Sequence, residues 1–326
     1  MFRENVPLSK FSSYKIGGPA RYFFEAKTAN ELKEAVEEAK KRNLEFLVLG
    51  GGTNFLIGDE GFSGLVLKPS IDFLEIFGEE ISVGAGTSMH ALVSFSAEHS
   101  LSGLEWAGGL PGTVGGAIRG NAGAFGGEIK DSVEKVRSLD ISKLEEIERN
   151  VSGCEFGYRQ SVFSARGARQ QDGQGSALGG KNSRSYNKEI IISAVFGLAK
   201  GDSEKIKNSI NEKISYRREH HPMEHPNAGS IFKNVDVRKI TESQIARFKK
   251  SIKTDPFPVV PAAYIISEAG LKGLSCGGAM VSPKHPNFIV NVSNARSSDV
   301  KNLINLVKTE VKNKFGIDLE EEIISA

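Results

Sequence analysis

Cysteine is scarce in this sequence, because only Cys154 and Cys276 occur among its 326 residues. Two cysteines are too few for a disulfide framework or a zinc cluster, and the scarcity fits a reducing compartment. The first residues lack the apolar core that a secretion signal needs, and charged residues interrupt the longest later apolar stretches. We therefore expect a cytoplasmic protein that has no membrane-spanning segment.

An excess of charge of one sign is also missing. The 42 basic and 40 acidic residues leave a net charge of +2, which gives no electrostatic reason to expect nucleic acid or an anionic membrane as a partner. The stretch HHPMEHP, residues 220–226, suggests a metal site. However, its two prolines prevent a helix from presenting His221 and His225 on one face. We expect no metal.

The hydrophobic periodicity predicts a mixed α and β fold. RYFFEA (21–26) and LEFLVL (44–49) have the composition of strands, and a helical pattern that begins at the capping residue Thr28 lies between them. The chain is longer than one hydrophobic core usually requires, so more than one domain is expected. The low-complexity residues 164–187 lack any apolar period and predict a mobile surface insertion, although Tyr186 within it could cover a substrate.

Much of the glycine content of 36 residues falls in two segments. LGGGTNFLIGDEGFSG (49–64) lacks the lysine of a phosphate-binding loop and the third glycine of a GxGxxG motif. Such a run can form a tight turn alone, or it can expose several backbone N–H groups to an anion. The second segment (103–129) offers backbone that a flat ligand can approach closely. Together, the two segments favour a long dinucleotide.

Six segments, in this order, resemble the UDP-N-acetylenolpyruvoylglucosamine reductase (MurB) family. They are YKIGGPA (14–20), LGGGTNFLIGDEGFSG (49–64), GLPGTVGGAIRGNAGAFGGEI (109–129), CEFGYRQS (154–161), NAGSIFKN (227–234) and LEEEI (319–323). The chain passes from EIIISAVFGL directly into a helical pattern, as in the members of the family that lack an added substrate-covering loop, the type II kind. One departure is Glu321, because the family commonly has proline there.

The resemblance implies an α+β fold in three parts. Residues 1–68 and 69–200 would form the two subdomains of a FAD-binding region of the vanillyl-alcohol-oxidase (PCMH) type. Residues 201–326 would form a smaller α+β substrate-binding domain, whose last strand, at about 317–325, returns to the active site. The family also implies non-covalent FAD and NADPH as the electron donor, and we expect a monomer.

The same resemblance implies the residues that bind the cofactor. Those expected to hold the FAD pyrophosphate are Gly50, Gly51, Gly52, Thr53 and Asn54. Those expected to line the rest of the flavin are Pro111, Gly112, Thr113, Gly116, Asn121, Ala122 and Gly123. All twelve lie in the two glycine-rich segments.

The family reduces the enolpyruvyl ether of UDP-N-acetylglucosamine to UDP-N-acetylmuramate in peptidoglycan precursor synthesis. By resemblance, hydride passes from flavin N5 to the vinyl carbon, Arg159 contacts the substrate carboxylate, Ser230 donates the proton and Glu322 is the catalytic glutamate. Weaker expectations for substrate contact are Tyr158, Arg217, Arg218, Lys233 and Asn234.

Taken without the resemblance, the residues allow less specific interpretations. Arg159 could simply stack on Tyr158, and Ser230 could be an ordinary turn hydroxyl. Two other functions stay open at this point. One is a flavoprotein of the same fold class that oxidises an alcohol or hydroxy acid. The other is a nucleotide-sugar-binding module without catalysis.

Overall fold

The structure is a computed structural model that describes residues 2–164, 188–255 and 257–326. Apart from Ser164, the predicted insertion at 164–187, including Tyr186, lies outside the described residues. Contacts divide the chain into two compact units. The first contains Met1–Glu4, Arg21–Gly51 and Ser63–Ser215, and the second contains Asn5–Ala20, Gly52–Phe62 and Tyr216–Ala326. The predicted domain boundaries after residues 68 and 200 stay a prediction.

A four-stranded sheet carries the first glycine segment at the end of one strand. Its order is β1 (Arg3–Pro7), β2 (Pro19–Ala26), β5 (Phe62–Pro69) and β3 (Phe46–Val48). Between β2 and β3, helix α1 (Ala29–Lys41) buries Leu32, Ala35, Val36 and Ala39. Thr28 caps this helix by accepting from the N–H of Glu31 at 3.1 Å, so the predicted start is confirmed. The parallel pairing of β3 with β5 then directs residues 49–52 out of the sheet.

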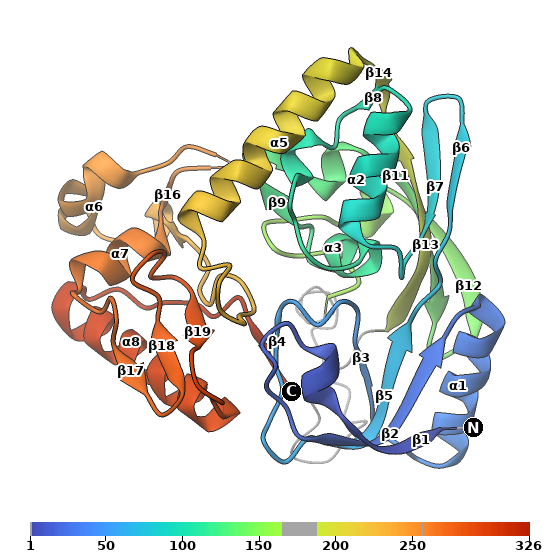
Figure 1. Ribbon diagram of the computed structural model, residues 1–326, viewed down its shortest axis with the longest axis horizontal. Helices are drawn as coiled ribbons and strands as arrows, with labels where there is room; N and C mark the ends of the chain where they lie inside the picture. The colour runs from blue at the N-terminus through green and yellow to red at the C-terminus, as the bar shows by residue number, and fades with distance from the viewer. Residues whose placement is uncertain (1, 165–187, 256) are drawn as a thin grey trace. The chain divides into compact units, whose positions relative to one another are not determined.

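A five-stranded antiparallel sheet forms the larger part of the first unit (Figure 1). Its order is β12 (Glu145–Asn150), β11 (Val133–Asp140), β13 (Glu189–Gly197), β7 (Glu80–Gly84) and β6 (Leu74–Phe77). The helices α2 (Met89–Glu98) and α3 (Val114–Arg119) share its hydrophobic core. Ser88 caps α2, since its hydroxyl accepts from the N–H of Ala91 at 3.0 Å.

Short elements complete the first unit. The strand pair β8 (Leu101–Ser102) and β14 (Ala199–Lys200) precedes helix α5 (Ser203–His220), which buries Ile206 and whose residues from Tyr216 on belong to the second unit. The hairpin β9 (Gly123–Ala124) and β10 (Gly127–Glu128) follows α3 and contains the end of the second glycine segment. The pairs β8–β14 and β9–β10 are separate two-stranded sheets and add no strand to the five-stranded sheet.

The second unit is built around helix α8 (Ser297–Phe315), which buries Val300, Leu303, Ile304, Val307 and Val311. The strands packed with it are β17 (Ser275–Cys276), β18 (Ala279–Val281) and β19 (Ile289–Asn291). The remaining elements of this unit are α6 (Glu242–Phe248), α7 (Ala262–Glu268), β15 (Val235–Asp236) and β16 (Val259–Val260). Tyr14 ties the early chain into this core by donating to the carbonyl of Ile289 at 2.6 Å.

The last residues pair with two different partners. Glu321 forms an antiparallel bridge with Phe232, and β20 (Ile324–Ser325) then pairs in parallel with β4 (Phe55–Leu56). Regular pairing is therefore shorter than the strand predicted at about 317–325, because the chain changes partner between Glu321 and Ile324. None of the described helices combines the length and apolar character that crossing a bilayer requires.

Candidate active site

The first glycine segment exposes a row of backbone donors. None of the N–H groups of residues 50–54 donates to an acceptor in the described part of the chain. Gly52 has a φ of +64°, and a Cβ placed on it would lie 1.9 Å from the carbonyl oxygen of Phe11, so this position accepts only glycine. Successive N–H groups around a left-handed residue form a concave site that suits an anion.

Within the first unit, the second glycine segment lies directly against Gly50 and Gly51 of the first. A Cβ on Gly51 would lie 2.7 Å from the Cα of Gly112, and a Cβ on Gly50 would lie 2.9 Å from Oγ1 of Thr113. Thr113 caps α3 by accepting from the N–H of Gly116 at 3.4 Å. Side chains at these glycines would separate the two loops, so their absence allows backbone to meet backbone.

The turn that carries Arg159 is bound to the end of this second segment. Gly157 and Gln160 exchange two backbone hydrogen bonds of 2.9 and 3.1 Å, which close a tight turn with Arg159 at a φ of +56°. The Arg159 guanidinium donates from Nη2 to the carbonyl of Gly123 at 3.0 Å and lies 5.3 Å from the ring centroid of Tyr158. The stacking that the residues alone allow is present, together with a contact to the predicted flavin loop.

Asn121 connects the same two segments. Its side-chain N–H₂ donates to Glu128 at 3.0 Å and to the carbonyl of Gly157 at 3.1 Å, and its Oδ1 accepts from the N–H of Lys130. Because this buried amide is bound to protein groups on both sides, we infer that Asn121 shapes the loop and that only its backbone is available to a flavin. The neighbouring Ala122 is half-buried.

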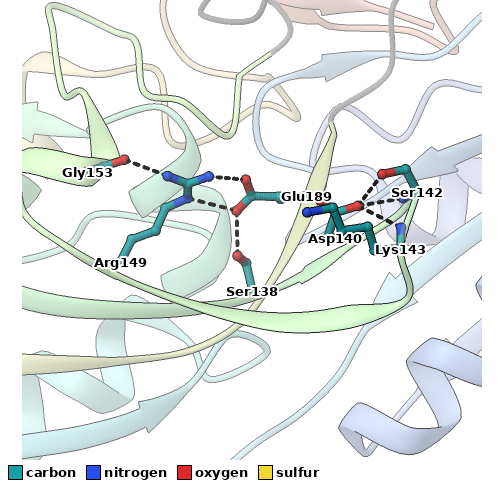
Figure 2. Close-up of polar contacts among 7 residues, drawn as sticks. All are labelled: Ser138, Asp140, Ser142, Lys143, Arg149, Gly153 and Glu189. Atoms are coloured by element: carbon teal, nitrogen blue, oxygen red, sulfur yellow. Dashed lines mark hydrogen bonds and ion pairs between the residues drawn. The ribbon is translucent and has the colours of Figure 1, made fainter.

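An ion pair between Arg149 and Glu189, drawn in Figure 2, lies at the base of the segment that leads to Arg159. Arg149 on β12 donates twice to Glu189 on β13, from Nε at 3.0 Å and from Nη2 at 2.5 Å. Ser138 on β11 donates to the same carboxylate at 2.6 Å, and Arg149 also donates to the carbonyl of Gly153 at 3.2 Å. The hydrogen-bonded carboxylate raises the pKa of Arg149 above its usual value. This cluster was not predicted from the sequence.

In the second unit, Ser230 follows a glycine turn. Gly229 has a φ of +78°, and no atom lies within 4 Å of the position of its missing Cβ, so the space beside the turn is open. Within the described residues, the half-buried Ser230 hydroxyl has no hydrogen-bond partner. The next residue is fixed, because the N–H of Ile231 donates to the carbonyl of Asn287 at 2.8 Å. A serine with a free hydroxyl on a fixed backbone can present its proton to a ligand.

Glu322 lies on the segment paired with this serine motif. Its N–H donates to the carbonyl of Ile231 at 2.7 Å, and the N–H of Lys233 donates to the carbonyl of Glu320 at 2.9 Å. The side chain of Asn54 donates to the carbonyl of Glu322 at 3.3 Å. The structure therefore brings three of the predicted segments together in the second unit, namely those of Asn54, Ser230 and Glu322.

Two of the weaker substrate candidates, Lys233 and Asn234, have protein partners of their own. Lys233 forms an ion pair with Glu320 at 2.9 Å, and Oδ1 of Asn234 accepts from the N–H of Ala262 at 3.2 Å. Arg217 is buried, which lowers its pKa, whereas Arg218 is exposed. Adjacent residues of a helix do not face the same side, so these two arginines do not form a pair of charges on one face.

The histidines near the serine motif lie in an apolar setting. The rings of His221 and His285 are 5.3 Å apart, and each lies near Phe288. Burial lowers the pKa of each to about 4. The described residues contain no cluster of three metal-ligating side chains. The expectation that the chain binds no metal stays a prediction.

Comparisons with known proteins identify the family of this chain. Residues 221–325 match the family described as "UDP-N-acetylenolpyruvoylglucosamine reductase, C-terminal domain", and residues 20–143 match "FAD binding domain". The chain is 36% identical over 325 residues to the UDP-N-acetylenolpyruvoylglucosamine reductase of Lachnoclostridium phytofermentans, covering 98% of this chain and 91% of that protein. It is 37% identical over 324 residues to the reductase of Chlamydia felis, covering 98% and 93%.

A solved structure is similar over the whole length. The crystal structure of the reductase (MurB) from Thermus caldophilus has a TM-score of 0.74 and 29% sequence identity, and the match covers 100% of this chain and 99% of that one. These matches confirm the predicted α+β fold with a FAD-binding domain. The chain belongs to the UDP-N-acetylenolpyruvoylglucosamine reductase family.

Proposed function

We propose that this chain is an FAD-dependent reductase of UDP-N-acetylenolpyruvoylglucosamine that takes its electrons from NADPH and forms UDP-N-acetylmuramate. The observation that carries the proposal lies in the second unit. There, a half-buried serine with a free hydroxyl and the backbone of Glu322 are held on paired segments beside the first glycine loop. A nucleotide-sugar-binding module has no need of a proton donor in this position.

The glycine segments fit FAD. The N–H groups of residues 50–54 suit a pyrophosphate, which is an anion that accepts several hydrogen bonds. Gly116 supports the same fit. Among the described residues, a Cβ there would meet only Oγ1 of Thr113 at 3.5 Å, so packing within the protein does not require glycine at this position. The space beside Gly116 would therefore be open to the cofactor. Pro111, Gly112 and Gly123 would line the flavin ring. When bound non-covalently, FAD supplies a hydride to the substrate double bond.

Arg159 would bind the substrate carboxylate. Hydride addition to the terminal vinyl carbon leaves negative charge on the adjacent carbon and its carboxylate. A planar, permanently charged guanidinium suits this group, and a preorganised charge typically contributes about 3 kcal/mol to the stability of such a transition state. The Arg159 turn is held by Gly123 and Asn121, which would keep the guanidinium oriented.

Ser230 would donate the proton that completes the reduction. A serine hydroxyl is a weak acid, so it remains protonated at rest and reacts only with a strongly basic carbon. Glu322 would lie near the reacting atoms and assist this transfer, while Tyr158, Lys233, Asn234 and one of Arg217 or Arg218 would contact the rest of the sugar nucleotide. The product serves peptidoglycan precursor synthesis, and a monomer in the cytoplasm is part of the proposal.

The test measures NADPH consumption with and without the enolpyruvyl sugar nucleotide. We expect substrate-dependent consumption by the wild type and a loss of about a hundredfold or more in Ser230→Ala. Ser275→Ala is the matched control, because Ser275 is exposed and, in the part of the chain that the structure describes, its hydroxyl bonds only the nearby Gly273 carbonyl. Equal consumption by all three proteins would overturn the proton donor. Reduction of the bound flavin by an alcohol or hydroxy acid, together with no NADPH consumption when the sugar nucleotide is added, would overturn the substrate.

A further inference from the structure

One hydroxyl joins the first glycine loop to the serine motif. Ser13 Oγ lies 2.7 Å from the carbonyl oxygen of Asn227, to which it donates, and 3.2 Å from the carbonyl oxygen of Gly52. The backbone N–H of Ser13 also donates to the Gly52 carbonyl at 3.1 Å. All three residues belong to the second unit. Ser13 lies next to YKIGGPA, a segment for which the proposed function gives no role.

The contact at Gly52 fixes the direction of a neighbouring donor. In a planar trans peptide, the C=O of one residue and the N–H of the next point in opposite directions. Because Ser13 holds the Gly52 carbonyl, the N–H of Thr53 must point away from Ser13. That N–H has no acceptor among the described residues and belongs to the row that suits the pyrophosphate. Ser13 therefore orients a donor for the anion without contacting the anion.

The contact at Asn227 fixes the start of the serine motif. The side chain of Asn227 is itself bound, since Nδ2 donates to the carbonyls of Pro222 and His225 and Oδ1 accepts from the N–H of Gly229. The bond from Ser13 to the Asn227 carbonyl restrains the backbone of this residue as well. Ser230 follows directly after this turn, so the orientation of its hydroxyl depends on the same restraint.

We propose that Ser13 is a positioning residue that sets the register of the proton donor against the FAD phosphate loop. The inference rests on the proposed function, but its structural half, the anchoring of Gly52 and Asn227, can be measured without cofactor or substrate. Ser12 provides a matched comparison. Among the described residues, its buried hydroxyl accepts only from the N–H of Tyr14, at 3.2 Å and two residues away, so it joins no distant segments there.

The experiment compares Ser13→Ala, Ser13→Thr and Ser12→Ala with the wild type. Hydrogen exchange of the apoprotein reports the anchoring, because Ile231, Phe232 and Lys233 use their N–H groups in hydrogen bonds. We expect faster exchange over residues 227–234 in Ser13→Ala than in Ser12→Ala. FAD titration should show about fivefold weaker binding for Ser13→Ala, the value of one net hydrogen bond. Ser13→Thr, which keeps the hydroxyl, should restore both.

A kinetic comparison separates positioning from general loosening. NADPH oxidation with ferricyanide as an artificial electron acceptor requires no proton from Ser230. Ser13→Ala should therefore lose more turnover with the sugar nucleotide than with ferricyanide, while Ser12→Ala loses both in proportion. Equal exchange and a proportional loss in the two alanine variants would overturn the proposal. A wild type that binds no FAD would instead overturn the proposed function, and the exchange data would still decide whether Ser13 anchors the two segments.

Discussion

The N–H of Glu322 donates to the carbonyl of Ile231 at 2.7 Å, so the residue after the predicted proton donor is paired directly with the predicted catalytic glutamate. This bond and the one from Lys233 to Glu320 flank the bridge between Phe232 and Glu321. In an antiparallel pair of this kind, both ladder bonds come from the flanking residues. The side chains of Ser230 and Glu322 are therefore placed by backbone pairing, which a conservative side-chain substitution leaves intact.

Glu322→Gln should lower turnover with the sugar nucleotide by about a hundredfold while FAD binding stays unchanged. The change removes the charge and keeps the shape, and the backbone bond to Ile231 remains. Glu321→Gln is the matched control, because Glu321 forms an ion pair with Lys308 at 2.8 Å and is not expected to contact the substrate. Steady-state kinetics and FAD titration of both variants provide the measurement. Equal turnover in the two variants would remove Glu322 from the catalytic set.

Gly51 and Gly116 should respond differently to a methyl group. Gly51→Ala would force a Cβ to within 2.7 Å of the Gly112 backbone, whereas Gly116→Ala would meet only Oγ1 of Thr113 at 3.5 Å. We expect Gly51→Ala to destabilise the apoprotein by about 2 kcal/mol, in the range of overpacking. Gly116→Ala should fold normally and bind FAD more weakly, because its methyl group enters the expected ligand space.

Thermal unfolding of the apoproteins and FAD titration separate these two effects. If Gly116→Ala binds FAD as tightly as the wild type, the flavin does not approach α3 at this glycine. If Gly51→Ala is as stable as the wild type, the close approach of the two glycine segments is not needed for folding.

Glu189→Gln should destabilise the first unit by about 2 kcal/mol. The substitution leaves the guanidinium of Arg149 without its countercharge and weakens the bond from Ser138. The side chain of Glu189 is 8% exposed and that of Arg149 26%, so solvent screens this pair only in part. Glu148→Gln on β12 is the control, because its partner Lys135 lies 3.8 Å away and both side chains are mostly exposed. That control should change stability by less than about 0.5 kcal/mol.

Urea denaturation gives the free energy of unfolding for both variants. If Glu189→Gln lowers the free energy of unfolding no more than Glu148→Gln does, the bidentate pair of Arg149 and Glu189 contributes little to stability. In that case the base of the Arg159 segment would be held by the bonds of Asn121 to Gly157 and of Ser161 to Arg119 instead.

Features of the structure that depend on neighbours in sequence were predictable. The caps at Thr28 and Ser88 are hydrogen bonds between residues three positions apart, so the local sequence alone indicates them. The pair of Arg149 and Glu189 spans 40 residues, and the bond from Ser13 to Asn227 spans 214. Contacts at such separation depend on strand register and on how loops pack, which no local pattern records.

The departure at Glu321 has a physical explanation that the sequence alone could not supply. The bonds on either side of the bridge use the N–H groups of Lys233 and Glu322, and neither uses the N–H of Glu321. Proline, which lacks this N–H, would leave both bonds intact. Glutamate and proline are therefore compatible with the same register at this position, and the glutamate adds an ion pair with Lys308.

The buried histidines predict a loss of stability in acid. Burial, together with the smaller effect of positive neighbours that include Arg217 and Lys253, lowers the pKa of His221 and His285 to about 4. In the unfolded chain both would titrate near the ordinary value of about 6.5. Between these two values the unfolded state binds more protons, so the free energy of unfolding contributed by these groups falls as pH drops from about 6.5 to about 4 and falls no further below that.

His285→Gln should flatten this part of the pH dependence, because glutamine does not titrate. His90→Gln is the control, since His90 is exposed on α2 and its replacement should leave the slope unchanged. Urea denaturation at several pH values between about 7 and 4 measures the slopes. Carboxylates that ionise over the same range contribute equally to all three proteins, so the difference between the variants isolates the histidine. A wild type and a His285→Gln variant with parallel curves would mean that this histidine gains no proton on unfolding and is already exposed to water in the folded protein.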